Sequence, residues 1–261
     1  MLKKEGRKGQ VTIFIIIAII IVSVGALLYF FVPSIRNSIG TRIENPNDFI
    51  DTCVKDKLRE SVELVSANGG SIEPEHTVNY KGEEIEYLCY TNRDFVLCSV
   101  EQPFLRKHIE EEIYDNIRDV AVECFGDLEK VYRNRGYDVN LEPFEMKVEL
   151  LPKRVVVTFN SELVLTKGET ERYEQFVVFM NNNLYELVGI ANSILEKETL
   201  SGIAQLDFYR SIYGQINFER NYLADETKIY SLTDRTSGDK FRFASRSLTH
   251  GPGIGNIPGI S

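Results

Sequence analysis

Four cysteines are the residues whose type and spacing point to the most definite chemistry. Cys53, Cys89, Cys98 and Cys124 are widely separated, and no two of them stand in a C-x-x-C spacing. Because a zinc site takes close-set thiols or nearby histidines, this spacing disfavours a metal site. An even number of cysteines favours disulfides in an oxidising compartment, although four cysteines allow three connectivities. We expect two disulfides, with four free buried thiols as the alternative.

Local patterns favour one of the three connectivities. Residues 85–100 alternate like a hairpin with a turn near the middle, which places Cys89 opposite Cys98. Cys53 and Cys124 each belong to an apolar stripe at helical spacing, so both are expected to face inward where two helices meet. The predicted disulfides are therefore Cys53–Cys124 and Cys89–Cys98.

Other polar combinations lack the context that catalysis requires. His108 precedes Glu110, Glu111 and Glu112. Successive residues point around a helix, so we expect a solvated acidic face there and not a metal cluster. Residues 227–234 and 239–247 are expected to form a closing hairpin. The S-x-x-K pattern that begins at Ser237 falls in its turn, whereas the mechanism needs the serine at a helix start.

The remaining candidate binding or catalytic residues also lack a suitable sequence context. The Gly-x-Gly pattern that begins at Gly251 has no helix after it and so does not predict a phosphate site. Spacing implies no partner for His76 or His250. We therefore predict no catalytic residue, no metal ligand and no cofactor, and a protein that is not an enzyme.

An uncharged segment near the N-terminus predicts attachment to a membrane. Residues 11–32 carry no charged side chain, and as a helix they would extend roughly 33 Å, against a hydrocarbon layer of roughly 30 Å. Four basic residues in the leader, residues 1–10, favour a cytoplasmic N-terminus. We expect a retained, single-pass transmembrane helix in the cell membrane, with the lipid bilayer as a partner and the C-terminal domain outside. Removal of a signal peptide after Ala26 is the alternative.

The leader and the residues after it also resemble a known type of signal sequence. The stretch RKGQVTIF resembles the class III signal of type IV pilins and archaeal pilin-like proteins, and it is similar to the opening of archaeal single-pass surface proteins of unknown role. The pilin resemblance covers about 25 residues and implies cleavage between Gly9 and Gln10. At the fifth mature position, where that family carries Glu, this chain has Phe14, which weakens the expectation of polymerisation more than that of cleavage.

The charge of the chain restricts its partners. The net charge is −9, and residues 33–261 hold 26 basic and 38 acidic side chains, a net of −12. An acidic surface repels phosphate backbones, so nucleic acid is not expected as a partner. A protein partner or self-assembly at the cell surface remains compatible with this charge.

The order of elements after the span predicts an α+β fold in which antiparallel sheets pack against three helices. Residues 33–136 are expected to form a helix-hairpin-helix subdomain that contains the cysteines. A β-meander plus helix subdomain is expected over residues 137–247, and a flexible Gly/Pro tail over residues 248–261. The expected helices cover residues 46–67, 103–134 and a stretch from 184, and the expected strands of the meander cover 144–151, 154–160, 162–168 and 173–180, with a turn at Asn160-Ser161.

These features predict a membrane-anchored, extracytoplasmic protein with a non-enzymatic binding or scaffold role at the cell surface. The alternatives are a type IV pilin-like subunit cleaved after Gly9, and an ectoenzyme whose site is built from residues far apart in the sequence. N-terminal sequencing of the native protein separates the anchor from the cleaved forms. A start at Met1 or Leu2 indicates a plain anchor, a start at Gln10 a processed leader, and a start at Leu27 a removed signal peptide.

Overall fold

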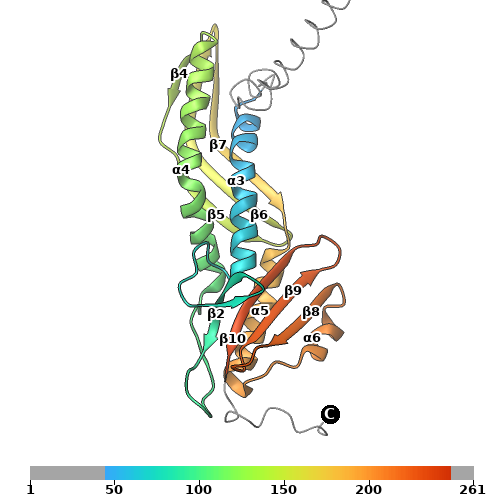
Figure 1. Ribbon diagram of the computed structural model, residues 1–261. Helices are drawn as coiled ribbons and strands as arrows, with labels where there is room; N and C mark the ends of the chain where they lie inside the picture. Colours follow the sequence, from blue (N-terminus) through green and yellow to red (C-terminus); the bar gives the residue numbers. More distant parts are fainter. Residues whose placement is uncertain (1–44, 248–261) are drawn as a thin grey trace, which may run out of the picture. The chain divides into compact units, whose positions relative to one another are not determined.

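The computed structural model describes residues 45–247. The described residues from Pro46 onward belong to one compact unit (Figure 1). The basic leader 1–10, the expected span 11–32, the expected cleavage site at Gly9 and Gln10, and the expected tail 248–261 all lie outside the described residues. The helices are α3 (Pro46–Asn68), α4 (Leu105–Asn134), α5 (Leu184–Ser201) and α6 (Leu206–Ile212); the strands are β1 (Thr77–Tyr80), β2 (Glu83–Tyr90), β3 (Ser99–Val100), β4 (Asp138–Leu141), β5 (Glu145–Leu151), β6 (Arg154–Lys167), β7 (Glu169–Asn181), β8 (Ile216–Tyr222), β9 (Lys228–Asp234) and β10 (Lys240–Arg246).

The predicted fold class needs correction in three respects. The described residues form an α+β fold with two sheets and four helices, where three helices were expected, because the short α6 was not anticipated. The sheets are not wholly antiparallel, since β2 and β10 run parallel. The expected transmembrane helix is not found either, since none of the four described helices is long and apolar enough to cross a membrane.

The four-stranded sheet is organised around the long strand β6. One edge of β6 pairs with β7 along its length, and the other edge pairs with β5 and β4. Alternate residues of β6 are buried, so one face of the sheet is covered while the other meets water. Helices α3 and α4 lie side by side and cover this face (Figure 1). Phe125 of α4 contacts Phe144, Phe159 and Phe176, with ring centroids 4.7–5.4 Å apart.

One predicted turn in this sheet is wrong. Asn160-Ser161 was expected to separate two strands, but β6 continues through it and only shifts its register against β7 between Asn160 and Leu163. The Ser161 hydroxyl donates to the carbonyl of Glu142 at 2.6 Å. The polar pair therefore marks a β-bulge, which bends a strand without ending it.

The six-stranded sheet joins distant parts of the chain. Its order is β1-β2-β10-β9-β8, and β3 also pairs with β2. The β9–β10 hairpin was expected from the sequence and is confirmed. Strand β2 comes from the expected subdomain 33–136 and β10 from the expected subdomain 137–247, so the two subdomains share one sheet within a single compact unit.

Both expected disulfides are present. Cys53 of α3 is bonded to Cys124 of α4, with Cα atoms 6.0 Å apart, and Cys89 is bonded to Cys98 with Cα atoms 5.4 Å apart. Two details differ from expectation. Cys124 is buried, but Cys53 lies at the exposed margin of the helix pair and does not face inward. Cys89 pairs across the ladder with Val100, because β3 begins only after Cys98.

Helix α3 ends in a tight glycine turn that fits closely between β2 and α4. Gly69 has φ +100°, and Gly70 donates its N–H to the carbonyl of Val65 at 2.8 Å, which closes the helix end. A Cβ added at Gly69 would lie 2.8 Å from the Cβ of Glu86. Gly69 therefore meets both a conformational and a steric requirement for glycine.

We predict that Gly69→Ala lowers the free energy of unfolding by about 1–3 kcal/mol, because alanine disfavours this φ and cannot avoid Glu86. Urea denaturation followed by circular dichroism measures the change. Gly82→Ala is the matched control, since Gly82 has φ +89° but open space where a Cβ would stand. A loss at Gly69 no larger than that at Gly82 would contradict the steric part of this explanation.

Candidate functional site

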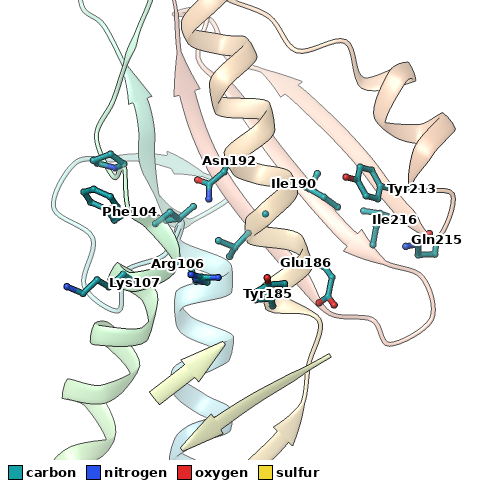
Figure 2. A pocket seen from close by; sticks show the side chains of 14 residues that line it. Phe104, Arg106, Lys107, Tyr185, Glu186, Ile190, Asn192, Tyr213, Gln215 and Ile216 are labelled. Carbon is teal, nitrogen blue, oxygen red and sulfur yellow. The ribbon is translucent and has the colours of Figure 1, made fainter. Parts of the chain in front are cut away.

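A groove opens between the start of α4 and the first half of α5 (Figure 2). Its volume is about 580 Å³, within the range of sites that take small ligands or side chains of a partner. Three segments form it, namely residues 103–107, residues 185–192 on α5 and residues 213–216, which lead into β8. The lining comprises Pro103, Phe104, Leu105, Arg106, Lys107, Tyr185, Glu186, Val188, Gly189, Ile190, Asn192, Tyr213, Gln215 and Ile216.

Phe104 stands at an unusual position for an aromatic residue. It is the N-cap residue of α4, and it is 77% exposed. Ser, Thr, Asp and Asn are preferred at this position because their side chains accept a hydrogen bond from a free backbone N–H, which phenylalanine cannot do. Phe104 thus contributes neither a cap nor much buried area to the fold, and its ring is available at the rim of the groove.

Gly189 is a second groove residue that does little for the fold. It lies inside α5 and is exposed, and no atom stands within 4 Å of where its Cβ would be. Glycine inside a helix is less favourable than alanine by roughly 0.5–1 kcal/mol. Since internal packing does not require a glycine here, its effect is to keep the α5 wall of the groove open.

The charged residues of the groove are mainly basic. The guanidinium of Arg106 lies over the ring of Tyr185, 5.7 Å from its centroid. Arg106 forms no ion pair with any residue that the structure describes, whereas Lys107 pairs with Glu111 at 3.4 Å. Glu186 is the one acidic lining residue, and it accepts a hydrogen bond from the N–H of Lys153 at 3.4 Å. The lining therefore holds two basic side chains and one acidic side chain, and of the two basic ones Lys107 already has an acidic partner.

A second hollow of about 690 Å³ is lined by residues of α3 and of the strands β8, β9 and β10, among others. Its basic and acidic residues neutralise one another, as in the ion pair between Arg242 and Glu83. Ser237 and Lys240, the S-x-x-K pair of the sequence, both line it. The Ser237 hydroxyl donates to Asp239 at 2.6 Å, within the β9–β10 turn. The interpretation of this motif as turn chemistry is confirmed.

The disulfide-closed loop between Cys89 and Cys98 exposes further apolar side chains. Phe95, Val96 and Leu97 are 70%, 41% and 38% exposed. This loop is a rival surface for a partner, but it lines neither of the hollows described above. It supplies a comparison for experiments on the groove.

The residues around His108 have structural partners. The Ser71 hydroxyl donates to Glu86 at 2.6 Å and lies 2.8 Å from Nε2 of His108. Glu112 accepts the N–H of Ile72 at 2.7 Å. The expectation of a wholly solvated acidic face is therefore wrong, because this face of α4 holds the segment that follows α3.

Glu110 has a similar role, since it accepts the N–H of Leu150 on β5 at 2.9 Å. Glu111, by contrast, is exposed, as expected. Among the residues that the structure describes, no group of three or more His, Cys, Asp or Glu side chains could hold a metal ion.

Glu86 introduces a dependence of stability on pH. The side chain is 7% exposed, and burial raises the pKa of its carboxyl above the ordinary value of 4.5, against the opposing effect of the Ser71 hydrogen bond. The native state then binds more protons than the unfolded state, so the stability from this group is present below pH 4.5 and decreases as the pH rises through the native pKa.

We predict that Glu86→Gln removes this decrease. Between pH 4 and pH 8 the free energy of unfolding of the variant should rise relative to that of the unmodified protein, because glutamine carries no charge to bury. Denaturant titrations across that range measure the difference. If the free energy of unfolding changed with pH in the same way in both proteins, Glu86 would not be the source of the pH dependence.

A buried polar cluster surrounds Glu198 near the end of α5. Its carboxylate accepts hydrogen bonds from Lys228, Tyr230 and Ser245, and each of these residues is at most 3% exposed. These residue types occur in catalytic sites, but neither hollow reaches them. The cluster ties α5 to β9 and β10.

Comparison with protein-family models, with curated proteins and with solved structures gives no match for this chain.

Sequence reasoning predicted no binding residue and so did not find the groove. Two signals were present in retrospect. Pro103-Phe104 precedes a strongly periodic helix without supplying a polar cap, and Gly189 interrupts an otherwise good helical pattern. Both residues break a local rule of helix formation, and the structure brings them to the same groove.

Proposed function

We propose that this protein is a non-enzymatic binding protein that acts outside the cytoplasm and holds a partner in the groove between α4 and α5. The observation that carries the proposal is Phe104, an aromatic ring 77% exposed at a helix N-cap. Large exposed aromatic side chains beside a preformed hollow are typical of binding surfaces. Residues that weaken local structure without packing inside the protein tend to mark functional positions.

The disulfides support the proposed compartment. Disulfides persist outside the cytoplasm and are rare in the reducing cytosol. Protein taken from its native cells with free thiols blocked should therefore gain four hydrogens on reduction, two for each disulfide. An unchanged intact mass would contradict a location in an oxidising compartment.

Site-specific photo-crosslinking tests the groove itself. A benzophenone amino acid is placed at Phe104 in the full-length chain, and at Phe95 in a parallel chain as a control of similar exposure, 70% against 77%. Irradiation of cells that produce the protein should yield a discrete adduct from position 104 and not from position 95. Adducts from position 95 alone would move the partner site to the disulfide loop and contradict the proposal.

Phe104→Ser should separate binding from stability. Serine supplies the missing cap, so we expect the free energy of unfolding to rise by about 1 kcal/mol. The same variant should lose the partner, because the ring at the rim is gone. Thermal unfolding measures the first effect. The second is measured with the benzophenone amino acid at the lining residue Tyr213, whose adduct should disappear in Phe104→Ser. A variant that is destabilised would show that the ring supports the fold, contrary to this interpretation.

A further inference from the structure

Strand β7 has one edge without a neighbouring strand among the described residues. It pairs with β6 along its length, and no other described strand lies beside it. At the end of this ladder the N–H of Asn182 donates to the carbonyl of Lys153. Hydrogen-bonded and non-hydrogen-bonded pairs alternate in an antiparallel ladder. The residues at odd positions from 175 to 181 therefore direct their N–H and C=O groups to the open edge, and all four of them are exposed.

The two halves of β7 differ in how this edge is protected. An open strand edge can pair with another chain, and proteins commonly prevent this with charged side chains. The second half of the strand, residues 175–181, has the sequence QFVVFMN and carries no charge. Val177 and Phe179 in this half are 43% and 48% exposed. Only the first half carries charged side chains, at Glu169, Glu171, Arg172 and Glu174.

The other edge strands that the structure describes lack such an open stretch. Strands β1, β3 and β4 have only two to four residues each. Strand β5 carries Glu145, Lys147 and Glu149, and β8 carries Glu219 and Arg220. Short length and charge are the two usual forms of protection, so the uncharged half of β7 is the exception within this fold.

The order of residues in the uncharged half makes it complementary to itself. Two copies can run antiparallel about a two-fold axis at Val178, with their exposed faces on the same side. The odd-numbered residues then exchange main-chain hydrogen bonds, and polar side chains meet polar ones while apolar side chains meet apolar ones. Moving the axis by one residue in either direction places an amide side chain opposite Phe179 or Val177. The opposed pairs about Val178 are Gln175 with Asn181, Phe176 with Met180, Val177 with Phe179 and Val178 with itself.

We infer that a second copy of this chain pairs with residues 175–181 of β7, so that two four-stranded sheets form one continuous sheet. The charged half of each β7 then extends beyond the paired segment and does not face its own copy. A strand of a different protein could also cover an apolar edge, but it would not require this symmetric order of polar and apolar residues. The surface is separate from the groove between α4 and α5, since no residue of β7 lines that groove.

Sedimentation equilibrium of the full-length protein in detergent tests the inference. The unmodified protein should form a dimer. Val177→Lys combined with Phe179→Lys should weaken the dimer by about tenfold or more, because each lysine then stands opposite a lysine of the other copy. The matched control is Val122→Lys combined with Leu200→Lys, which adds the same charge at positions 56% and 64% exposed on α4 and α5. It should change the dissociation constant by less than about twofold.

Cysteine crosslinking tests the register. Chains with Val177→Cys mixed with chains with Phe179→Cys should form far more covalent dimer on mild oxidation than either variant alone, because these two positions are opposed. Thermal unfolding confirms that all variants remain folded. A protein that stays monomeric at about 0.1 mM would overturn the inference and favour a strand of another protein at this edge. A dimer that the paired lysines do not weaken would place the interface elsewhere, and equal crosslinking of Val177→Cys alone would contradict the two-fold axis at Val178.

Discussion

Replacing Glu198 with leucine should lower the free energy of unfolding by about 3–5 kcal/mol, because it leaves a buried ammonium group without its partner. The carboxylate of Glu198 is fully buried and accepts hydrogen bonds from Lys228 and Tyr230 at 2.5 Å and from Ser245 at 3.0 Å. Burial already lowers the pKa of Lys228, and the charge of Glu198 opposes that shift. Without Glu198 the ammonium retains the carbonyl of Gly202 as its partner in this cluster.

Two controls distinguish the loss of the ion pair from a loss of helix or packing. Glu196→Leu, two residues away on the exposed side of α5, should change stability by at most about 0.5 kcal/mol. The double variant Glu198→Leu with Lys228→Met should recover most of the lost stability, because apolar pairs often replace buried ion pairs without penalty. Denaturant titrations of the three variants measure these values. A double variant as unstable as Glu198→Leu would show that the hydrogen-bond network, and not the unpaired charge, dominates.

Removal of the Cys53–Cys124 disulfide should have an effect of similar size. The bond closes a loop over a sequence separation of 71 residues, and the chain-entropy model assigns it about 4 kcal/mol. It also connects the two helices that cover the four-stranded sheet. Without the bond, the segments that form these helices move independently in the unfolded chain, which raises the entropy of the unfolded state. We expect Cys53→Ala with Cys124→Ala to lower the midpoint of urea unfolding accordingly.

The second disulfide provides the comparison. Cys89–Cys98 closes a separation of only 9 residues, for which the same model gives about 2.5 kcal/mol. The alanine double variant at these positions should therefore remain the more stable of the two. The reverse order would mean that the strain or packing of each bond outweighs the entropy of loop closure.

Periodicity in the sequence was sufficient to predict those helices and strands whose contacts are local or whose core face is continuous. Helix α3 was expected over 46–67 and is observed over Pro46–Asn68, and the β9–β10 hairpin was found from two alternating stretches around a turn. Position within a helical stripe also gave the correct partner for Cys53, although it could not show that this residue lies at the margin of the stripe.

The features that were missed depend on contacts between distant residues. Asn160-Ser161 has the composition of a turn, but β6 stays extended through it, because β7 pairs with β6 on both sides of the bulge and the other edge pairs with β5 before it and β4 after it. The parallel pairing of β2 with β10 has no local signal at all. The groove is of the same kind, since Phe104 and Gly189 meet only after α4 and α5 have packed.

The position of β10 in its sheet has a consequence for how the chain must be made. β10 is the last strand of the described residues, yet it lies between β2 and β9, so the inner edge of β2 has no neighbour until residues 240–246 are made. About 150 residues separate the two strands, and at cellular rates of synthesis this interval lasts roughly 8 to 30 s. During that time the nascent protein presents an open strand edge, the form most prone to wrong pairing. A chain interrupted before β10 would keep that edge of β2 open.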